Sequence, residues 1–244
     1  MKDNFSKVSS LYVQFRPVYP QKLYDVIFHL LSGRNAAWDC GTGNGQVASV
    51  LADYFTKVFA SDISENQIVH AVRKENIYYS VQPVERTSYN NNQFDLIIAA
   101  QAAHWFDLQK YYREVDRTLR RDGVLALVGY SHVELDEPIG SIIGRFKCGI
   151  LAGFWDRERK YVDDRYSTLP FPYQDIAFPD MDVRYNWTLE QLVGYLHTWS
   201  AVQHYRDHEN VDPVSIILAE LEHAWGKAEL RKVTFPLFAR IGKK

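Results

Sequence analysis

Cysteine is scarce in this chain of 244 residues, and the two that occur, Cys40 and Cys148, form no C-x-x-C pair. No cluster of histidine and cysteine has the spacing of a structural zinc site. The composition therefore excludes a small domain held together by disulfides. We expect a protein that works in a reducing compartment and needs no structural metal.

Long apolar runs are also missing, because none approaches the roughly 18 residues of a membrane-spanning helix. The N-terminus lacks the apolar segment of a signal peptide. A formal net charge of −2 gives no excess of basic residues for nucleic acid. These absences predict a cytoplasmic protein that binds neither membrane nor nucleic acid. The sequence does not indicate an oligomeric state.

Internal repeats, low-complexity tracts and linkers are absent as well. Apolar runs typical of strands alternate with amphipathic helical patterns as far as residue 130, which predicts a parallel sheet with right-handed crossovers. We therefore expect a single α/β domain over residues 1–244, with a doubly wound and mostly parallel sheet. Residues 181–187 and 232–241 are the further strand candidates.

The most informative stretch is residues 36–46, where an apolar run ends in Asp39 and is followed by glycines at alternate positions, Gly41, Gly43 and Gly45. Glycine permits positive φ and lets a ligand lie against bare backbone N–H groups. The helix predicted to follow would direct its positive N-terminal end to the same place. This pattern indicates a nucleotide-like ligand.

The spacing of these glycines decides between nucleotides. A dinucleotide fingerprint, G-x-G-x-x-G, requires its third glycine at position 46, where this chain has Gln46.

A second carboxylate, Asp62, ends the next predicted strand, where it could accept hydrogen bonds from ribose hydroxyls. Ser64 and Gln67 then have the spacing of a capping box that opens a helix.

With its preceding acid, the G-x-G-x-G loop resembles the first motif of class I S-adenosylmethionine-dependent methyltransferases. The run from Tyr12 to Pro20 and the segment His104-Trp105-Phe106 are similar to those of the group related to trans-aconitate methyltransferase. The resemblance implies S-adenosylmethionine as cofactor and a seven-stranded sheet whose last strand is antiparallel, between strands five and six. It implies cofactor contacts from Asp39, Gly41, Thr42, Gly43, Gly45, Asp62, Ile63, Gln67, Val84, Glu85 and Ala100.

The same resemblance suggests a lid at residues 1–20 and acceptor contacts from Tyr12, Arg16, His104 and Trp105. A packed N-terminal arm is nearly as good an interpretation of Tyr12 and Arg16. His104 could take a proton from a phenol or an amine, orient a carboxylate, or serve only packing. We expect His104 to be catalytic and no metal to take part.

Residues 131–177 are rich in aromatic and charged side chains and predict an insertion that caps the active site. Within it, Arg157, Arg159, Lys160 and Arg165 are balanced by acids, so we interpret that part as a solvated surface helix.

The expected reaction is transfer of a methyl group to an oxygen, carboxylate or phenol, of a small-molecule acceptor. In-line positioning of the reactants is the main demand on the protein. A cofactor-binding regulatory protein without turnover and, less favoured, a nicotinamide-dependent oxidoreductase are the alternatives.

Overall fold

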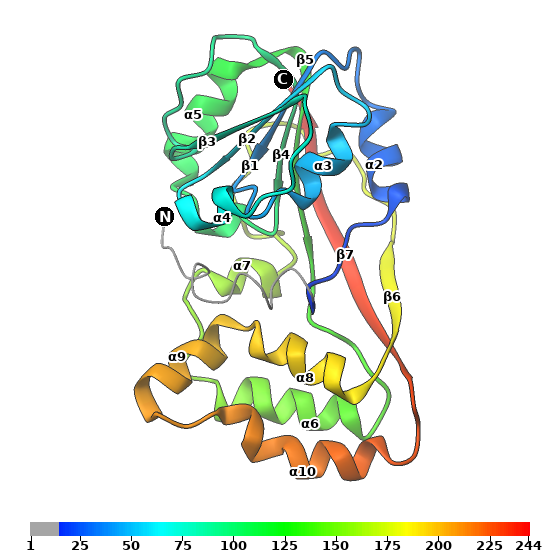
Figure 1. The fold of residues 1–244 in the computed structure, drawn as a ribbon. Helices are drawn as coiled ribbons and strands as arrows, with labels where there is room; N and C mark the ends of the chain where they lie inside the picture. Colours follow the sequence, from blue (N-terminus) through cyan, green and yellow to red (C-terminus); the bar gives the residue numbers. More distant parts are fainter. Residues whose placement is uncertain (1–14) are drawn as a thin grey trace.

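The computed structural model describes residues 15–244, which contain a seven-stranded sheet in the order β3-β2-β1-β4-β5-β7-β6 (Figure 1). The first five strands pair in parallel, and β7 runs antiparallel to both β5 and β6. This confirms the predicted sheet with its antiparallel last strand. The strands are β1 (Ala36–Cys40), β2 (Lys57–Asp62), β3 (Ile77–Val81), β4 (Phe94–Ala100), β5 (Leu119–Tyr130), β6 (Asp182–Trp187) and β7 (Arg231–Lys243).

Helices cover both faces of the parallel part of the sheet. Successive residues of a strand point to opposite faces, so each strand contributes side chains to both cores. In β1, Ala37 belongs to a core that includes Leu23 and Leu51, whereas the next residue, Trp38, belongs to a second core that includes Tyr111. All five residues of β1 are buried, as expected of a parallel strand covered on both sides. The helices of this part are α2 (Gln21–Phe28), α3 (Gln46–Leu51), α4 (Glu65–Val69) and α5 (Leu108–Thr118).

The boundary between α5 and β5 comes earlier in the chain than the helical spacing of Leu108, Tyr111, Val115 and Leu119 would indicate. The helix ends at Thr118, and the strand begins at the next residue, Leu119, which is fully buried and pairs with Phe94. Residues 122 and 123 also exchange backbone hydrogen bonds with Lys244. Residues that helical periodicity alone would assign to the helix therefore lie in the strand, because they pair with neighbouring strands of the sheet.

A group of helices packs together at the far end of the long strands, below the main part of the sheet in Figure 1. The predicted cap, residues 131–177, contributes α6, α7 and the single-turn π-helix η3, while the segment between β6 and β7 contributes the other three helices. Contacts of α10 with α6, α8 and α9 join the two segments. The elements are α6 (Ile139–Arg145), η3 (Phe146–Ile150), α7 (Arg159–Asp163), α8 (Leu189–His197), α9 (Ser200–Glu209) and α10 (Pro213–Trp225).

Two of these helices begin at capping residues that can be recognised in the sequence. Thr188 and Gln191 form a reciprocal capping box at the start of α8. Asp212 caps α10, whose first residue is Pro213. The sequence prediction did not include α6 and α9. Among residues 15–244, no helix is long and apolar enough to cross a bilayer.

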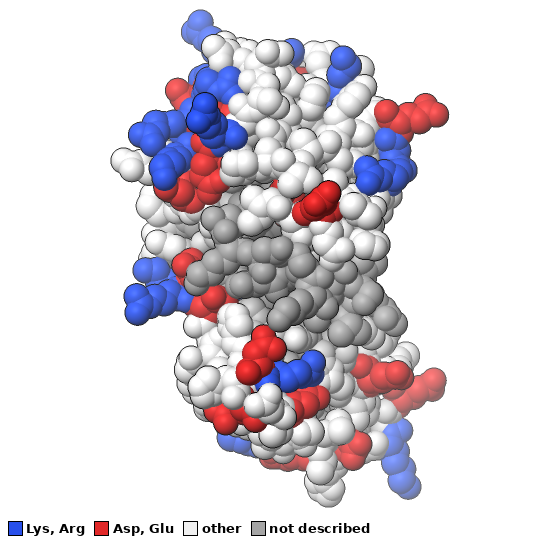
Figure 2. All heavy atoms as spheres, turned by 60° about the vertical axis from the view of Figure 1, so that its left-hand side comes forward, with Lys and Arg blue, Asp and Glu red and all other residues white. Residues whose placement is uncertain are grey.

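The interpretation of residues 155–166 as a solvated helix is wrong for one residue. Arg157, Lys160 and Arg165 are exposed, but the side chain of Arg159 is only 17% exposed. On the face in Figure 2, basic and acidic side chains are interspersed at the surface. A balanced count of charges did not show that one of the four cations points inward.

Candidate functional site

A cavity of about 930 Å³, measured with its open mouth, lies at the carboxyl ends of the parallel strands. In open α/β sheets this edge is where ligands bind. The loop after β1, the end of β2 and the segment after β4 all contribute to it. Its described lining is Arg16, Pro17, Tyr19, Asp39, Gly41, Thr42, Gly43, Asn44, Gln46, Val47, Asp62, Ile63, Ser64, Gln67, Ala100, Gln101, Ala102, Trp105, Phe106 and Tyr130.

The loop after β1 is shaped by its three glycines, all of which have positive φ. A Cβ on Gly41 would come within 2.8 Å of Ala102 Cβ, so this glycine lets the segment after β4 approach the loop. A Cβ on Gly43 would meet only Gln67 Oε1, at 4.0 Å, and would project into largely open space. The loop thus presents bare backbone to the cavity, as a closely approaching ligand requires.

Gly45 has a different role from the one expected. It does not line the cavity but caps α3 with φ 82°, and a Cβ there would lie 2.1 Å from the hydroxyl oxygen of Tyr79. That hydroxyl donates a hydrogen bond to the carbonyl of Val72 at 2.5 Å. The third glycine therefore makes room for a side chain of β3 that packs behind the loop.

Two carboxylates are fixed at the loop end of the cavity. Asp62 accepts backbone hydrogen bonds from Gly43 and Ser64, both at 2.9 Å. Asp39 accepts from the hydroxyl of Thr42 at 2.5 Å and from the amide of Ala48 at 3.0 Å. Burial raises the pKa of Asp39 to about 7, and the negative charge of Asp62 raises it further, against the lowering effect of those hydrogen bonds.

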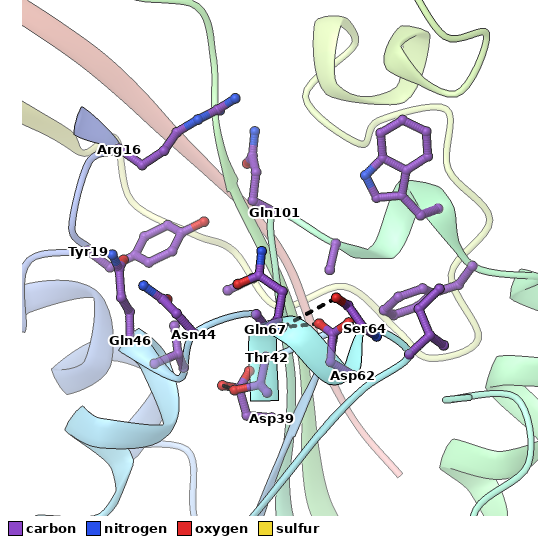
Figure 3. Close-up of a pocket in the computed structure, with 18 of the residues that line it drawn as sticks. Arg16, Tyr19, Asp39, Thr42, Asn44, Gln46, Asp62, Ser64, Gln67 and Gln101 are labelled. Carbon is purple, nitrogen blue, oxygen red and sulfur yellow. Dashed lines mark hydrogen bonds between the residues drawn. The ribbon is translucent and has the colours of Figure 1, made fainter. Parts of the chain in front are cut away.

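At the start of α4, one of the two hydrogen bonds of the predicted capping box is present. The Ser64 hydroxyl accepts a hydrogen bond from the amide of Gln67, as expected. The amide of Ser64 donates to Asp62 instead of to the side chain of Gln67. The Gln67 side chain is therefore not committed to that cap and lines the cavity (Figure 3).

The polar residues of the cavity divide into two groups in Figure 3, with the acidic and hydroxyl side chains Asp39, Thr42, Asp62 and Ser64 at one end. Arg16 and Gln101 extend toward the opposite end. The acidic end suits a ligand that carries ammonium and sulfonium charges and a diol, because carboxylates pair with the cations and accept from hydroxyls. The donor set and the open space over Gly43 therefore fit S-adenosylmethionine.

Among the described residues that line the cavity, Arg16 is the one cation, and it lies at the second end. Its Nη1 donates to the hydroxyl of Tyr130 and its Nη2 to the carbonyl of Thr198, both at 2.9 Å. Its guanidinium also lies over the ring of Tyr195, 5.5 Å from the centroid. Arg16 thus connects the N-terminal segment to β5 and to α8, and it gives this end of the cavity a positive charge.

His104 does not line the cavity, although the next residue, Trp105, does. The imidazole is buried, and its Nδ1 lies 2.9 Å from the hydroxyl of Tyr166. Burial lowers the pKa of His104 to about 3, and the nearby charges of Arg159 and Arg16 lower it further. The side chain is therefore neutral at physiological pH.

Two other predicted site residues, Val84 and Glu85, lie away from the cavity wall. Val84 is fully buried in the core on the α5 face of the sheet. Glu85 accepts a hydrogen bond from the amide of Asp107 at 3.0 Å. Tyr12 falls outside the described residues. The predicted contacts of Val84, Glu85 and Tyr12 stay predictions, whereas Asp39, Gly41, Thr42, Gly43, Asp62, Ile63, Gln67, Ala100, Arg16 and Trp105 meet around one cavity.

Sequence reasoning missed several lining residues that a positional signal could have found. Gln101 directly follows β4, and Tyr130 is the last residue of β5, so both stand at the carboxyl ends of predicted strands. Gln101 has φ 53°, and its side chain bonds both backbone groups of Tyr130. Tyr19 lies in the Arg-Pro-Val-Tyr-Pro segment that follows Tyr12.

The fold and this cavity define a class I S-adenosylmethionine-dependent methyltransferase, and comparison with known proteins supports the same family. A family model described as a methyltransferase domain matches residues 38–127. A methyltransferase of Dictyostelium discoideum is 31% identical over 99% of this chain and 95% of its own length. The chain belongs to this family, and its cofactor is S-adenosylmethionine.

Two further relatives are also described as methyltransferases. The solved structure of a protein described as a type II methyltransferase, from Anaeromyxobacter dehalogenans, is 38% identical, with a TM-score of 0.86 over 94% of this chain and 98% of that one. An S-adenosylmethionine-dependent methyltransferase of Saccharomyces cerevisiae is 27% identical over 68% of this chain and 59% of its own length. The resemblance to the trans-aconitate group stays a prediction.

Proposed function

We propose that this methyltransferase acts on a carboxylate oxygen of a small-molecule acceptor. The observation that carries the proposal is the positive charge of Arg16 at the end of the cavity opposite Asp39 and Asp62 (Figure 3). A guanidinium binds a carboxylate with two parallel hydrogen bonds, which also fixes its orientation. When bound, S-adenosylmethionine would supply an activated methyl group, to whose carbon the acceptor oxygen bonds as the carbon–sulfur bond breaks and S-adenosylhomocysteine leaves.

The state of His104 supports a carboxylate over a phenol. A phenol, with a pKa of about 10, must lose a proton before or during attack. An imidazole whose pKa is lowered to about 3 is a poor base for that step. A carboxylate is already ionised and needs no base, so the role left for His104 is to support the cavity wall beside Trp105.

The residues of the chain then have separate tasks in the proposed reaction. Asp39 and Asp62 hold the cofactor end, and Arg16 holds the acceptor end. Trp105 and Phe106 form an apolar part of the wall between them. Excluding water from this part strengthens the electrostatic contacts at both ends.

The test is release of S-adenosylhomocysteine over matched pairs of acids and amides, such as benzoate with benzamide and succinate with succinamide. The proposal expects turnover of acids and none of the corresponding amides, with rates that do not rise with pH between 6 and 9 once the cofactor is saturating. Turnover of phenols or amines but not of acids would overturn it. Binding of the cofactor with no turnover of any acceptor would favour the regulatory alternative.

A further inference from the structure

A second, largely buried cation, Arg159, lies close enough to Arg16 for their charges to interact, although it is not among the described residues of the cavity wall. Arg159 is the first residue of α7, and its Nε lies 3.5 Å from Oδ1 of Asp163, one turn later on the same helix. Its Nη2 lies 3.0 Å from Nδ1 of His132, two residues after the end of β5. Nε2 of His132 in turn lies 2.6 Å from Oδ1 of Asp163. The three side chains form a closed polar cluster.

The protonation state of His132 sets the direction of these hydrogen bonds. Burial lowers its pKa to about 4, and the charges of Arg159 and Lys147 lower it further, against the opposing effect of Asp163. The neutral ring has one donor and one acceptor nitrogen. Nε2–H therefore donates to Asp163, and Nδ1 accepts from Arg159. His132 and Asp163 thus fix the position of the guanidinium.

The cluster leaves positive charge in excess. Asp163 faces both Arg159 and Lys147, whose Nζ lies 3.2 Å from the same carboxylate oxygen. Burial lowers the pKa of Arg159, and the nearby Arg16 contributes in the same direction, against the raising effect of Asp163. An anion placed between the two guanidiniums would be attracted by both charges.

Arg159 and Arg16 lie on one group of aromatic rings. The guanidinium of Arg159 is 5.0 Å from the Trp155 ring centroid, and that of Arg16 is 5.5 Å from the Tyr195 centroid. Trp199 joins the two rings, with centroids 5.3 Å from Trp155 and 5.9 Å from Tyr195. Helix α7 also contacts η2 (Ala103–Trp105), which carries the wall residue Trp105.

Two donor atoms of Arg159 have no hydrogen-bond acceptor within residues 15–244: Nη1, and Nε, which is buried and lies 3.5 Å from Asp163. Only Nη2 is hydrogen-bonded, to His132. We propose that Arg159, positioned by His132 and Asp163, is the second cationic group of the acceptor site and binds the acceptor carboxylate together with Arg16. This inference rests on the proposed function and assigns acceptor selection to α7.

The experiment compares Arg159→Met with Arg157→Met, a matched control two residues away whose side chain is exposed. The inference expects Arg159→Met to raise KM for the acids that the wild type methylates by tenfold or more. We expect kcat to change by less than threefold, and the Kd for S-adenosylhomocysteine, measured by calorimetry, by less than twofold. Arg157→Met should match the wild type in all three.

The positioning role of His132 is tested by a double-mutant cycle. His132→Ala should raise KM for the same acids about threefold or more. Combined with Arg159→Met it should add nothing further, because the ring acts through the guanidinium. Additive effects of the two changes would show that His132 does not act through Arg159.

Two further measurements distinguish a loss of folding from a loss of function. If Arg159→Met does not fold, Arg159→Lys and Arg159→Gln replace it. Arg159→Lys keeps the charge, so it should raise KM by less than Arg159→Gln does. Direct binding of succinate to the protein saturated with S-adenosylhomocysteine is measured by calorimetry in every folded variant, and we expect Arg159→Met or Arg159→Gln to weaken it tenfold.

The outcomes distinguish the two proposals. Suppose that the wild type methylates acids and that Arg159→Met has the same KM for them as the wild type. The role of Arg159 is then overturned, and the proposed function stands. If Arg159→Met does not fold, the same comparison is made with Arg159→Lys and Arg159→Gln. If the wild type methylates only phenols or amines and does not bind succinate, both fall.

Discussion

Burial acts in opposite directions on Asp39 and His104. Both side chains are almost completely removed from solvent. Removal from water disfavours the charged form, so it raises the pKa of the acid to about 7 and lowers that of the base to about 3. Each residue therefore has a dependence on pH that its type alone would not suggest.

Cofactor affinity should rise with pH because of Asp39. The ionised carboxylate is the form that attracts the cofactor's ammonium group, and it becomes populated as the pH passes about 7. Between pH 6 and pH 8 we expect the Kd for S-adenosylhomocysteine, measured by calorimetry, to fall about three- to tenfold. The expected limit is tenfold per pH unit.

The control for this prediction is Asp39→Asn, whose affinity for S-adenosylhomocysteine should be weaker and nearly independent of pH.

The stability of the ligand-free protein should fall with rising pH, opposite to the trend in cofactor affinity. A group whose pKa is raised on folding contributes stability at low pH that is lost as the pH rises through the folded value. The free energy of unfolding of the wild type relative to Asp39→Asn should therefore fall between pH 5 and pH 8. A pH-independent Kd in the wild type would contradict the assignment.

His104→Ala should lower kcat while leaving cofactor affinity almost unchanged. The imidazole bonds Tyr166 and packs against Trp105, with ring centroids 4.8 Å apart, so its loss disturbs the wall near the acceptor. Initial rates and calorimetry on the same preparation measure the two effects. Equal losses of kcat and cofactor affinity would indicate a purely structural residue.

At the scale of elements, the loop between β1 and α3 is supported by β3. Tyr79 of β3 occupies the space beside Gly45 and bonds the carbonyl of Val72. The guanidinium of Arg73 lies 4.8 Å from the centroid of the Tyr79 ring. The geometry of the cofactor loop thus depends on a strand that supplies no described residue of the cavity wall.

Gly45→Ala should destabilise the protein by about 2 kcal/mol or more. A left-handed residue other than glycine costs roughly 1–2 kcal/mol, and the added Cβ would overlap the Tyr79 hydroxyl. Tyr79→Phe removes that oxygen, so Gly45→Ala should cost less in a Tyr79→Phe background. Urea denaturation of the four proteins of this cycle measures the difference. Additive costs would show that the contact with Tyr79 does not matter.

At the scale of the whole molecule, cofactor binding should stabilise the entire fold. The cavity joins the N-terminal segment, β1, β2, β4 and β5, which separate on unfolding. A ligand at 100 times its Kd adds about 2.7 kcal/mol to the free energy of unfolding. For a chain of this size, that amounts to a rise in Tm of about 5–10 °C.

Thermal melts with S-adenosylhomocysteine measure this rise, and Asp62→Ala provides the comparison. Loss of charge-assisted hydrogen bonds should weaken binding by about 1.5–3 kcal/mol. The rise in Tm at the same ligand concentration should therefore shrink to a few degrees or less. Asp182→Ala, at an exposed ion pair with Arg184 on β6, should retain the full rise. An undiminished rise in Asp62→Ala would refute the role of Asp62.

The sequence alone determined the sheet, the glycine loop and both carboxylates of the cofactor end. These features depend on local chemistry, because burial on both faces requires apolar strands and the loop's positive φ values favour glycine. Asp62 directly follows its strand in sequence, so its position at the sheet edge could be predicted from the strand itself. The capping box at Thr188 was predictable for the same reason.

Only the tertiary structure decided the proposed acceptor end. Arg16, Tyr130 and Arg159 come from distant parts of the chain. Packing brings Arg16 into hydrogen-bonding contact with Tyr130 of β5, and it brings the charge of Arg159 on α7 close to that of Arg16. A count of charges along residues 155–166 balanced to zero, yet burial is set by packing, and packing turned one cation inward. The same packing buried His104 and removed its basicity, which the type and position of the residue could not reveal.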